Sequence, residues 1–157
     1  MATRALTLRV AGAHDIVSVE ALMSEAFDPH YGEAWTRGQC LGVLALPGVA
    51  LLIAELDDEP AGFAMTRRVL DEAELLLLAV SPVHRGHGVG GALLRAAAAA
   101  ATAAGCVRFH LEVRDGNPAT RLYRRHGFAK VGERRGYYRG VDGALHDAHT
   151  YGAALDV

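Results

Sequence analysis

A glycine-rich segment at residues 85–91, with the sequence RGHGVGG, is the first feature of the chain whose residue types could do chemistry. It follows an expected strand at residues 73–80 and precedes an expected helix at residues 92–104. A strand, a glycine-rich turn and a helix can bind phosphate, because glycines let the backbone approach the anion and the helix N-terminus presents free N–H groups. Arg85 adds a positive charge. The segment therefore predicts a site for a phosphate-bearing ligand.

Two common nucleotide-binding motifs fit this segment poorly. A P-loop requires Gly-Lys-Ser/Thr, whereas Gly90 is followed here by Gly91 and Ala92. The dinucleotide fingerprint GxGxxG is matched only loosely at residues 86–91, and it should follow the first strand of a βαβ unit. This segment instead lies in the middle of the chain, after an expected hairpin. A nucleotide sensor is therefore a weak interpretation.

The segment at residues 108–114 alternates between apolar and polar residues, which predicts a strand with Glu112 on its polar face. A carboxylate can take a proton from an ammonium group if an apolar cleft raises its pKa or water relays the proton. From the residues alone, an ion pair on the same face is the favoured interpretation. The candidate partners of Glu112 on that face are Arg108, His110 and Arg114.

Hydrophobic periodicity and turn residues indicate the elements that must position these groups. Helices are expected at residues 13–27, 35–46, 92–104 and 118–126. Strands are expected at residues 7–10, 50–56, 61–69, 73–80, 108–114, 128–134 and 148–153. The leucines at residues 75–78 do not alternate, which favours a central strand covered on both faces. Asn117 is expected to cap the helix that begins at Pro118.

Length and composition indicate a single domain at residues 1–157, with its cysteines reduced. The chain is 157 residues long and 51% hydrophobic, which is enough for one core. No run of about 18 apolar residues predicts a membrane span, and no signal peptide is evident. Two cysteines are too few for a disulfide framework, so a cytoplasmic location is expected.

The net charge of −2 argues against nonspecific nucleic-acid binding. Residues 1–60 carry three arginines and nine acidic residues, whereas residues 61–157 carry thirteen basic and nine acidic residues. This segregation could match a cationic and an anionic partner, or it could be chance.

Histidines suggest two possible metal groups. His84 and His87 form one, and His146, Asp147 and His149 form the other. Neither set is completed by further ligands at a recognisable spacing, so no metal is expected.

Several motifs occur in the order in which the GNAT superfamily of acyl-CoA-dependent N-acetyltransferases has them. The superfamily signature Arg/Gln-x-x-Gly-x-Gly/Ala is matched by residues 85–90. Further matches are residues 80–82, 111–114, 117–119, 122–123 and 126–128. The chain resembles in particular the RimI-like branch, which acetylates the N-terminal alanine of a small-subunit ribosomal protein. That likeness rests on residues 69–73, 111–114, 134–138, 142–143 and 147–148.

This resemblance implies an α/β (α+β) fold, with a mixed, mostly antiparallel twisted sheet flanked by helices and with splayed fourth and fifth strands. It implies acetyl-CoA as co-substrate, no metal, and direct acetyl transfer to an amine. The implied acceptor is a protein N-terminus, as in a ribosomal protein. Acetylation of a small amine or a lysine side chain, and a non-catalytic CoA-binding module, are the alternatives.

The resemblance also implies roles for individual residues. Glu112 would be the general base and Tyr123 the general acid, although Tyr123 could equally be a core aromatic residue. The chain is one residue shorter between Asn117 and Tyr123 than the branch pattern. This difference could shift Tyr123 relative to the cofactor or shorten the loop before Pro118, and the unaltered spacing from Tyr123 to Gly127 and Phe128 favours the loop. Tyr137 and Tyr138 would border the acceptor or pack in the sheet. The implied cofactor-binding residues are Leu78, Ala79, Val80, Arg85, Gly86, His87, Gly88, Val89, Gly90, Gly91 and Asn117.

Overall fold

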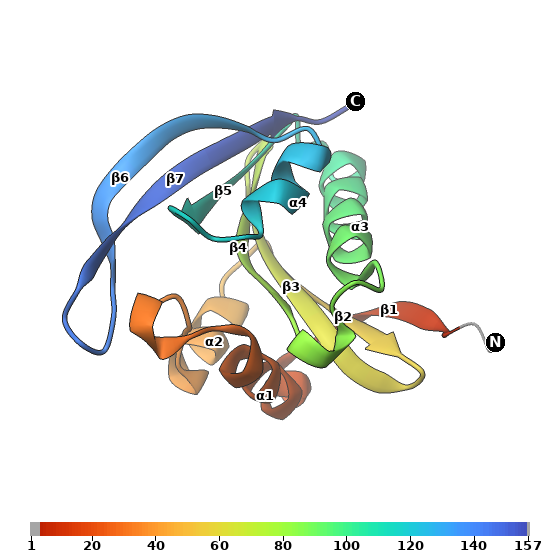
Figure 1. The fold of residues 1–157 in the computed structure, drawn as a ribbon. Helices are drawn as coiled ribbons and strands as arrows, with labels where there is room; N and C mark the ends of the chain where they lie inside the picture. Colours follow the sequence, from red (N-terminus) through yellow and green to blue (C-terminus); the bar gives the residue numbers. More distant parts are fainter. Residues whose placement is uncertain (1–3, 157) are drawn as a thin grey trace.

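The computed structural model describes residues 4–156 and contains a seven-stranded sheet with helices on both faces (Figure 1). The strands are β1 (Leu6–Ala11), β2 (Val49–Leu56), β3 (Glu59–Val69), β4 (Glu72–Val80), β5 (Arg108–Arg114), β6 (Ala129–Arg139) and β7 (Leu145–Ala154). The α-helices are α1 (Ile16–Ala26), α2 (Arg37–Leu44), α3 (Val89–Ala103) and α4 (Thr120–Arg125). Single 3₁₀ turns are η1 (Ala13–Asp15), η2 (Pro29–Tyr31) and η3 (Pro82–His84).

The strand order in the sheet is β1-β2-β3-β4-β5-β7-β6. All neighbouring strands pair antiparallel except β4 and β5, which pair parallel. A parallel pair needs a crossover connection, and α3 supplies it between β4 and β5. The expected mixed, mostly antiparallel sheet is therefore confirmed.

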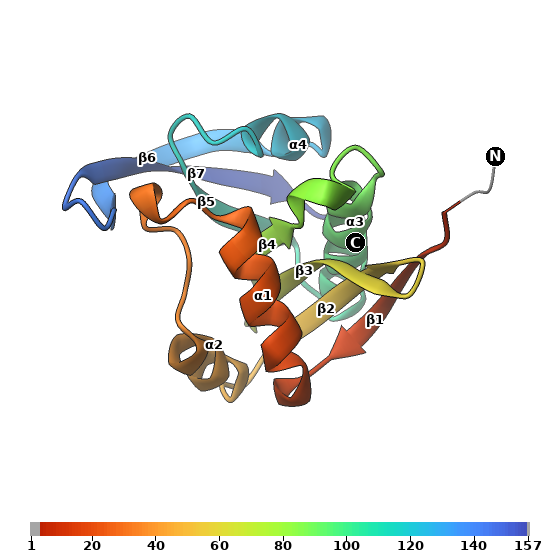
Figure 2. The same ribbon diagram turned by 60° about the horizontal axis from the view of Figure 1, so that its bottom comes forward.

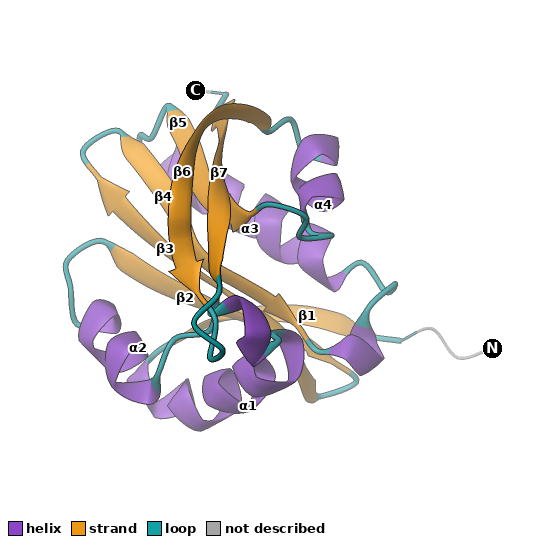
Figure 3. Ribbon diagram, turned by 60° about the vertical axis from the view of Figure 1, so that its left-hand side comes forward, coloured by secondary structure: helices purple, strands orange, loops and turns teal. Residues whose placement is uncertain are grey.

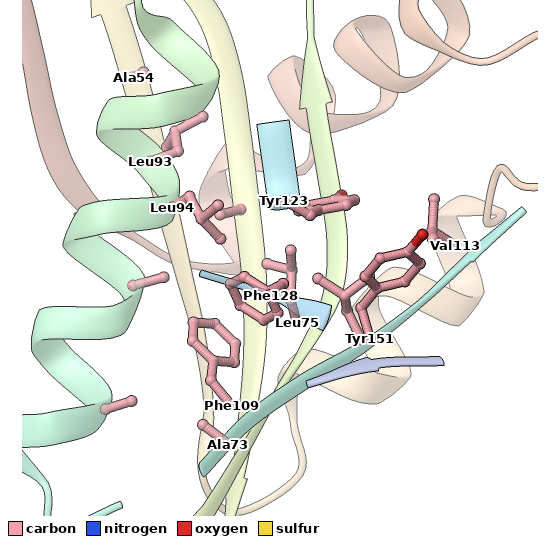
Figure 4. Packing of buried hydrophobic residues seen from close by; sticks show 14 of the residues in the cluster. Ala54, Ala73, Leu75, Leu93, Leu94, Phe109, Val113, Tyr123, Phe128 and Tyr151 are labelled. Carbon is pink, nitrogen blue, oxygen red and sulfur yellow. The ribbon is translucent and has the colours of Figure 1, made fainter. Parts of the chain in front are cut away.

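Two apolar clusters fill the space between the sheet and its helices. On one face, Leu93 and Leu94 of α3 pack toward Phe109, Phe128 and Tyr151 (Figure 4). On the other face, α1 and α2 cover a second cluster built on β2, β3 and β4. Figures 2 and 3 show α1 and α2 together on one side of the sheet and α3 on the other. The central strands are thus covered on both faces, as the unbroken leucine run of β4 predicts.

The parallel strands β4 and β5 separate halfway along their length. Their pairing ends at Leu75 and Leu111. Beyond that point β4 stays paired with β3 as far as Val80, and β5 stays paired with β7 as far as Arg114. The two strands therefore diverge while each keeps its outer neighbour, which confirms the expected splay and opens the sheet at its centre.

A β-bulge in β4, at the point where β4 and β5 begin to diverge, reverses the face of the sheet to which the following side chains point. Thr66 of β3 pairs with Leu75 and Met65 pairs with Leu77, so that Leu76 is an extra residue. Leu75 belongs to the cluster beneath α3, whereas Leu77 belongs to the cluster beneath α1. Without the bulge, both leucines would share one face.

Several element boundaries differ from the sequence expectation. The first helix begins as the turn η1, and α2 begins at Arg37 because Thr36 and Gln39 form a capping box. The helix α3 begins within the glycine-rich segment, at Val89. The strands β6 and β7 pair with each other beyond the segments expected from the sequence, at residues 128–134 and 148–153, and are therefore longer than predicted. No helix within residues 4–156 is long and apolar enough to cross a membrane.

Candidate active site

A cleft of about 840 Å³ lies where β4 and β5 diverge. One wall is formed by residues 74–80 of β4 and by the glycine-rich segment, and the opposite wall by residues 111–114 of β5 and by α4. Residues 26–35, between α1 and α2, and the pair Tyr137 and Tyr138 complete it. The cleft brings together all the sequence-predicted site residues except His87.

The glycine-rich segment turns sharply between η3 and α3. Gly86 and Gly88 have φ angles of 81° and 79°, in the left-handed region that favours glycine. Gly88 is the N-cap of α3 and makes no side-chain cap hydrogen bond. A Cβ at Gly90 would lie 3.1 Å from Leu122 Cδ2, so glycine allows α4 to approach closely. The first backbone N–H groups of α3 therefore lie at the cleft without a capping side chain.

Arg85 and His87 of this segment point in different directions. The exposed Arg85 lines the cleft, and its Nη2 lies 3.4 Å from the carbonyl oxygen of Ala26. Among the described residues Arg85 has no carboxylate partner. His87 Nδ1 instead lies 3.2 Å from the His84 carbonyl oxygen and 3.1 Å from the Arg85 carbonyl oxygen. His87 thus turns back on its own loop.

The residues at the end of β4 present backbone groups to the cleft. Leu78, Ala79 and Val80 all line it. Beyond Leu75 the edge of β4 that faces β5 has no paired strand. A backbone N–H on that edge is available to a ligand in the cleft.

Glu112 points away from the apolar residues of β5, as the alternation predicts. Its carboxylate accepts hydrogen bonds from Thr150 Oγ1 of β7 at 3.0 and 2.9 Å. Arg134 Nε of β6 lies 3.3 Å from Oε1 of Glu112, whose side chain is 12% exposed. An ion pair therefore forms, but with a partner from another strand.

The three sequence-predicted ion-pair partners of Glu112 lie elsewhere. Arg114 pairs with Glu33 at 3.1 Å, and His110 Nε2 lies 3.9 Å from Glu74. No ion pair with Glu112 is formed by Arg108, His110 or Arg114.

Tyr123 lies on α4 at the floor of the cleft and is 6% exposed. Its ring packs against Phe128 at 6.0 Å (Figure 4). Burial, and secondarily the charge of Glu33, raises the pKa of the Tyr123 phenol above its ordinary value. Tyr123 is therefore both a core aromatic residue and a protonated hydroxyl at the cleft. The shorter segment after Asn117 leaves both residues in the cleft.

Glu33 is a buried carboxylate that the sequence analysis did not select. It accepts a hydrogen bond from Asn117 Nδ2 at 2.9 Å and pairs with Arg114, and both charged side chains are 10% exposed. The guanidinium of Arg114 lies 3.5 Å from the ring centroid of Tyr31. This network ties η2 and the residues after it to the end of β5. The sequence analysis did not select Glu33 because this residue stands alone between Gly32 and Ala34, outside any segment with hydrophobic periodicity.

Asn117 has a local role as well. Its Oδ1 accepts a hydrogen bond from the N–H of Ala119 at 2.9 Å, whereas α4 itself begins at Thr120. The expectation that Asn117 caps this helix is therefore wrong, because the N-cap of α4 is Ala119, which makes no side-chain cap hydrogen bond, and Asn117 instead closes a turn before the helix.

Tyr137 and Tyr138 lie in a bulged part of β6. Arg134 pairs with Ala148 and Tyr138 with His146, so the residues between them are irregular. The two tyrosine rings meet edge to face at 4.9 Å. Tyr138 donates a hydrogen bond of 3.4 Å to the Glu112 carbonyl oxygen, and burial raises the pKa of its phenol.

The tip of the β6–β7 hairpin lies beside η2 (Figure 1). The N–H of Val141 donates to the Pro29 carbonyl oxygen at 3.3 Å, and the rings of Tyr31 and His146 meet at 5.1 Å. Within residues 4–156 no group of three or more histidine, cysteine or acidic side chains could hold a metal ion.

The cleft, its glycine-rich turn and the splayed strands define a class of protein. The model for the acetyltransferase (GNAT) family matches residues 16–128, and the chain therefore belongs to that family. Two curated relatives are ribosomal protein bS18-alanine N-acetyltransferases. The Haemophilus influenzae enzyme is 38% identical over 87 residues, which cover 55% of this chain and 60% of that enzyme. The Haemophilus ducreyi enzyme is 35% identical over 115 residues, which cover 73% and 79%.

Solved structures agree with this assignment. The ribosomal-protein-S18-alanine N-acetyltransferase of Escherichia coli matches with a TM-score of 0.85 and 27% identity, over 98% of this chain and 96% of that one. Ard1 from Thermoplasma volcanium matches with a TM-score of 0.83 and 25% identity, over 98% and 99%.

Proposed function

We propose that this protein is an acetyl-CoA-dependent N-acetyltransferase whose acceptor is the α-amine of a protein N-terminus, of the ribosomal-protein-alanine type. The observation that carries the proposal is the cleft between β4 and β5, which holds the glycine-rich segment, Glu112 and Tyr123 together. The curated relatives described above are ribosomal protein bS18-alanine N-acetyltransferases. Those alignments leave part of each relative unmatched, so the acceptor is proposed here from the cleft as well.

The residues of the cleft fit acetyl-CoA. Positive φ angles at Gly86 and Gly88 and the uncapped start of α3 form a backbone cradle for the pyrophosphate. Arg85 supplies a charge without a carboxylate partner among the described residues. The unpaired edge of β4 at residues 78–80 can receive the pantetheine and donate an N–H to a carbonyl oxygen. When bound, acetyl-CoA supplies the acetyl thioester.

Two side chains can move the protons that acetyl transfer requires. Glu112 is the proposed general base, which accepts a proton from the acceptor ammonium directly or through water. Its exposed partner Arg134 can move aside for the acceptor, while Thr150 keeps the carboxylate in place. Tyr123 is the proposed general acid, because its raised pKa keeps the phenol protonated until a thiolate departs. The two substrates then meet directly, without a covalent enzyme intermediate.

The acceptor is proposed to enter beside η2 and the tyrosines of β6. Tyr31, Tyr137 and Tyr138 line that end of the cleft, and the tip of the β6–β7 hairpin is hydrogen-bonded to η2 beside it. An aromatic entrance suits the extended end of a polypeptide, since aromatic rings bury large apolar areas against a chain.

Thiol release from acetyl-CoA tests this proposal. One peptide begins with alanine and has a free N-terminus, and the matched peptide has a blocked N-terminus and an internal lysine. Release with the free N-terminus alone is the expected result. Release with the lysine peptide, or with a small amine only, would assign the enzyme to another acceptor. Binding of CoA with no release at all would indicate a non-catalytic CoA-binding module.

A further inference from the structure

Two arginines and a histidine lie where α3 and α4 meet the cleft, beyond the glycine-rich segment. Arg95 lies on α3, Arg125 ends α4, and His126 follows α4 directly. All three line the cleft. Their positions, about two turns into α3 and at the end of α4, place them next to the proposed pyrophosphate cradle but outside it.

The guanidinium of Arg95 is held in a defined place. His126 Nδ1 lies 2.9 Å from the Leu122 carbonyl oxygen, so a neutral imidazole carries its proton on Nδ1. The Nε2 lone pair is then free to accept from Arg95 Nη1, which lies 3.5 Å away. A Cβ at Gly91 would lie 3.1 Å from Arg95 Nη1 and 3.5 Å from His126 Cε1. Glycine at residue 91 therefore leaves the room in which these two side chains meet.

This cluster differs from the five arginines of the protein that pair with a carboxylate. Arg4, Arg9, Arg37, Arg114 and Arg134 each pair with a carboxylate. Within residues 4–156, Arg95, Arg125 and His126 have no such partner. Unpaired cations on a concave surface create a local positive potential, and guanidinium groups match the oxygens of a phosphate.

We propose that Arg95, oriented by His126, and Arg125 bind the 3′-phosphate of CoA. The inference rests on the proposed function, because CoA carries two separate anionic groups. The backbone cradle at residues 86–91 accounts for the pyrophosphate, whereas the cationic cluster accounts for the phosphomonoester on the ribose. The cluster then lets the enzyme distinguish CoA from its 3′-dephospho form.

Titration calorimetry with CoA and with 3′-dephospho-CoA tests the proposal on the ligand-free protein. The wild type is expected to bind CoA about 10–100-fold more tightly, the range expected for hydrogen bonds between charged groups. Arg95→Ala and Arg125→Ala are expected to weaken CoA binding while leaving 3′-dephospho-CoA binding unchanged. Arg121→Ala is the matched control, because Arg121 is exposed on α4 but does not line the cleft.

His126→Ala tests whether His126 orients Arg95 or only supports the fold. With the thermal midpoint unchanged, it is expected to reduce the preference for CoA over its 3′-dephospho form, since Arg95 loses its orienting partner. Arg95→Lys is expected to restore part of the preference, because it restores the charge but not the planar fork.

The proposal is overturned if the wild type binds both forms equally, if it binds neither, or if Arg95→Ala weakens both by the same factor. The last result would place Arg95 at the pyrophosphate instead. Thiol release with the two peptides remains a separate readout. A retained preference for CoA without acetyl transfer would overturn the proposed function while supporting this site.

Discussion

Thr150 of β7 holds the carboxylate of Glu112 on β5, with its hydroxyl 3.0 and 2.9 Å from the two carboxylate oxygens. The sheet register pairs these two residues directly. The proposed base is therefore fixed from its own sheet, while its second partner, Arg134, is 61% exposed and lies on the edge strand.

Thr150→Val is expected to reduce kcat about tenfold, with little change in the affinity for acetyl-CoA. The methyl group keeps the shape of the side chain but removes the hydrogen bond, which is worth about 1.5 kcal/mol for a charged acceptor. Thr150→Ser keeps the hydroxyl and should retain most of the activity. Steady-state kinetics of both variants measure the difference. Equal kcat values for the valine and serine variants would show that the hydroxyl does not position the base.

Glu112→Gln is expected to lower kcat by about 10²–10⁴-fold, the usual contribution of a general base. CoA binding should be unchanged, because Glu112 lies away from the glycine-rich segment. Glu133→Gln is the control, since Glu133 is a carboxylate of β6 that does not line the cleft. Turnover by Glu112→Gln that matches the wild type at every pH would remove Glu112 from this role.

Tyr123→Phe is expected to lower kcat by a factor in the same range, about 10²–10⁴. Because burial raises the pKa of this phenol, Tyr123 stays protonated throughout the physiological range and beyond its ordinary value of 10. The wild-type rate should therefore show no loss from ionisation of Tyr123 below pH 10. An alkaline decline in the wild type that disappears in Tyr123→Phe would contradict this assignment. A melting curve checks that the buried ring still packs.

Glu33→Ala is expected to lower the free energy of unfolding by about 3–5 kcal/mol, because it leaves the buried Arg114 without its counter-charge. The exposed pair of Glu20 and Arg37 provides the contrast, and Glu20→Ala should hardly change the thermal midpoint. Chemical denaturation of the two variants gives the comparison. Similar losses of unfolding free energy at both positions would show that the buried Glu33–Arg114 pair stabilises the fold no more than an exposed pair does.

The pair of Asp15 and Arg9 is expected to make stability depend on acid pH. Arg9 donates to both Asp15 oxygens, at 2.8 and 3.2 Å, and lowers the pKa of this carboxyl from 3.8 to about 2. A lowered folded-state pKa contributes stability above pH 3.8, which is lost as pH falls toward 2. Asp15→Asn should therefore melt below the wild type at pH 6, and the gap should narrow between pH 3.8 and 2. Asp156→Asn, at an exposed carboxylate, controls for net charge. A constant gap over that window would refute the linkage.

Local sequence patterns predicted the parts of the site that lie within one element. The alternation of β5 placed Glu112 on the face away from Phe109 and Leu111, and the structure places it there. The glycine-rich turn before α3 was likewise visible, because its residue types act through their own backbone. The splay of β4 and β5 came from the family resemblance.

Long-range partners could not be predicted in this way. Arg134 and Thr150 reach Glu112 only through the register of β5, β6 and β7, so the sequence favoured nearer and incorrect partners. Glu33 lies in a segment without periodicity, and its burial depends on Arg114, which is 81 residues away. His87 shares the glycine-rich turn, but its ring bonds to loop carbonyls instead of facing the cleft.

The most direct test of the central claim is to locate the transferred acetyl group. A single peptide that begins with alanine and contains an internal lysine is incubated with the enzyme and acetyl-CoA, and fragment masses identify the modified nitrogen. The account predicts acetylation of the N-terminal α-amine, with the lysine unmodified and with Glu112→Gln nearly inactive. Acetylation of the lysine instead, or of neither nitrogen, would contradict it.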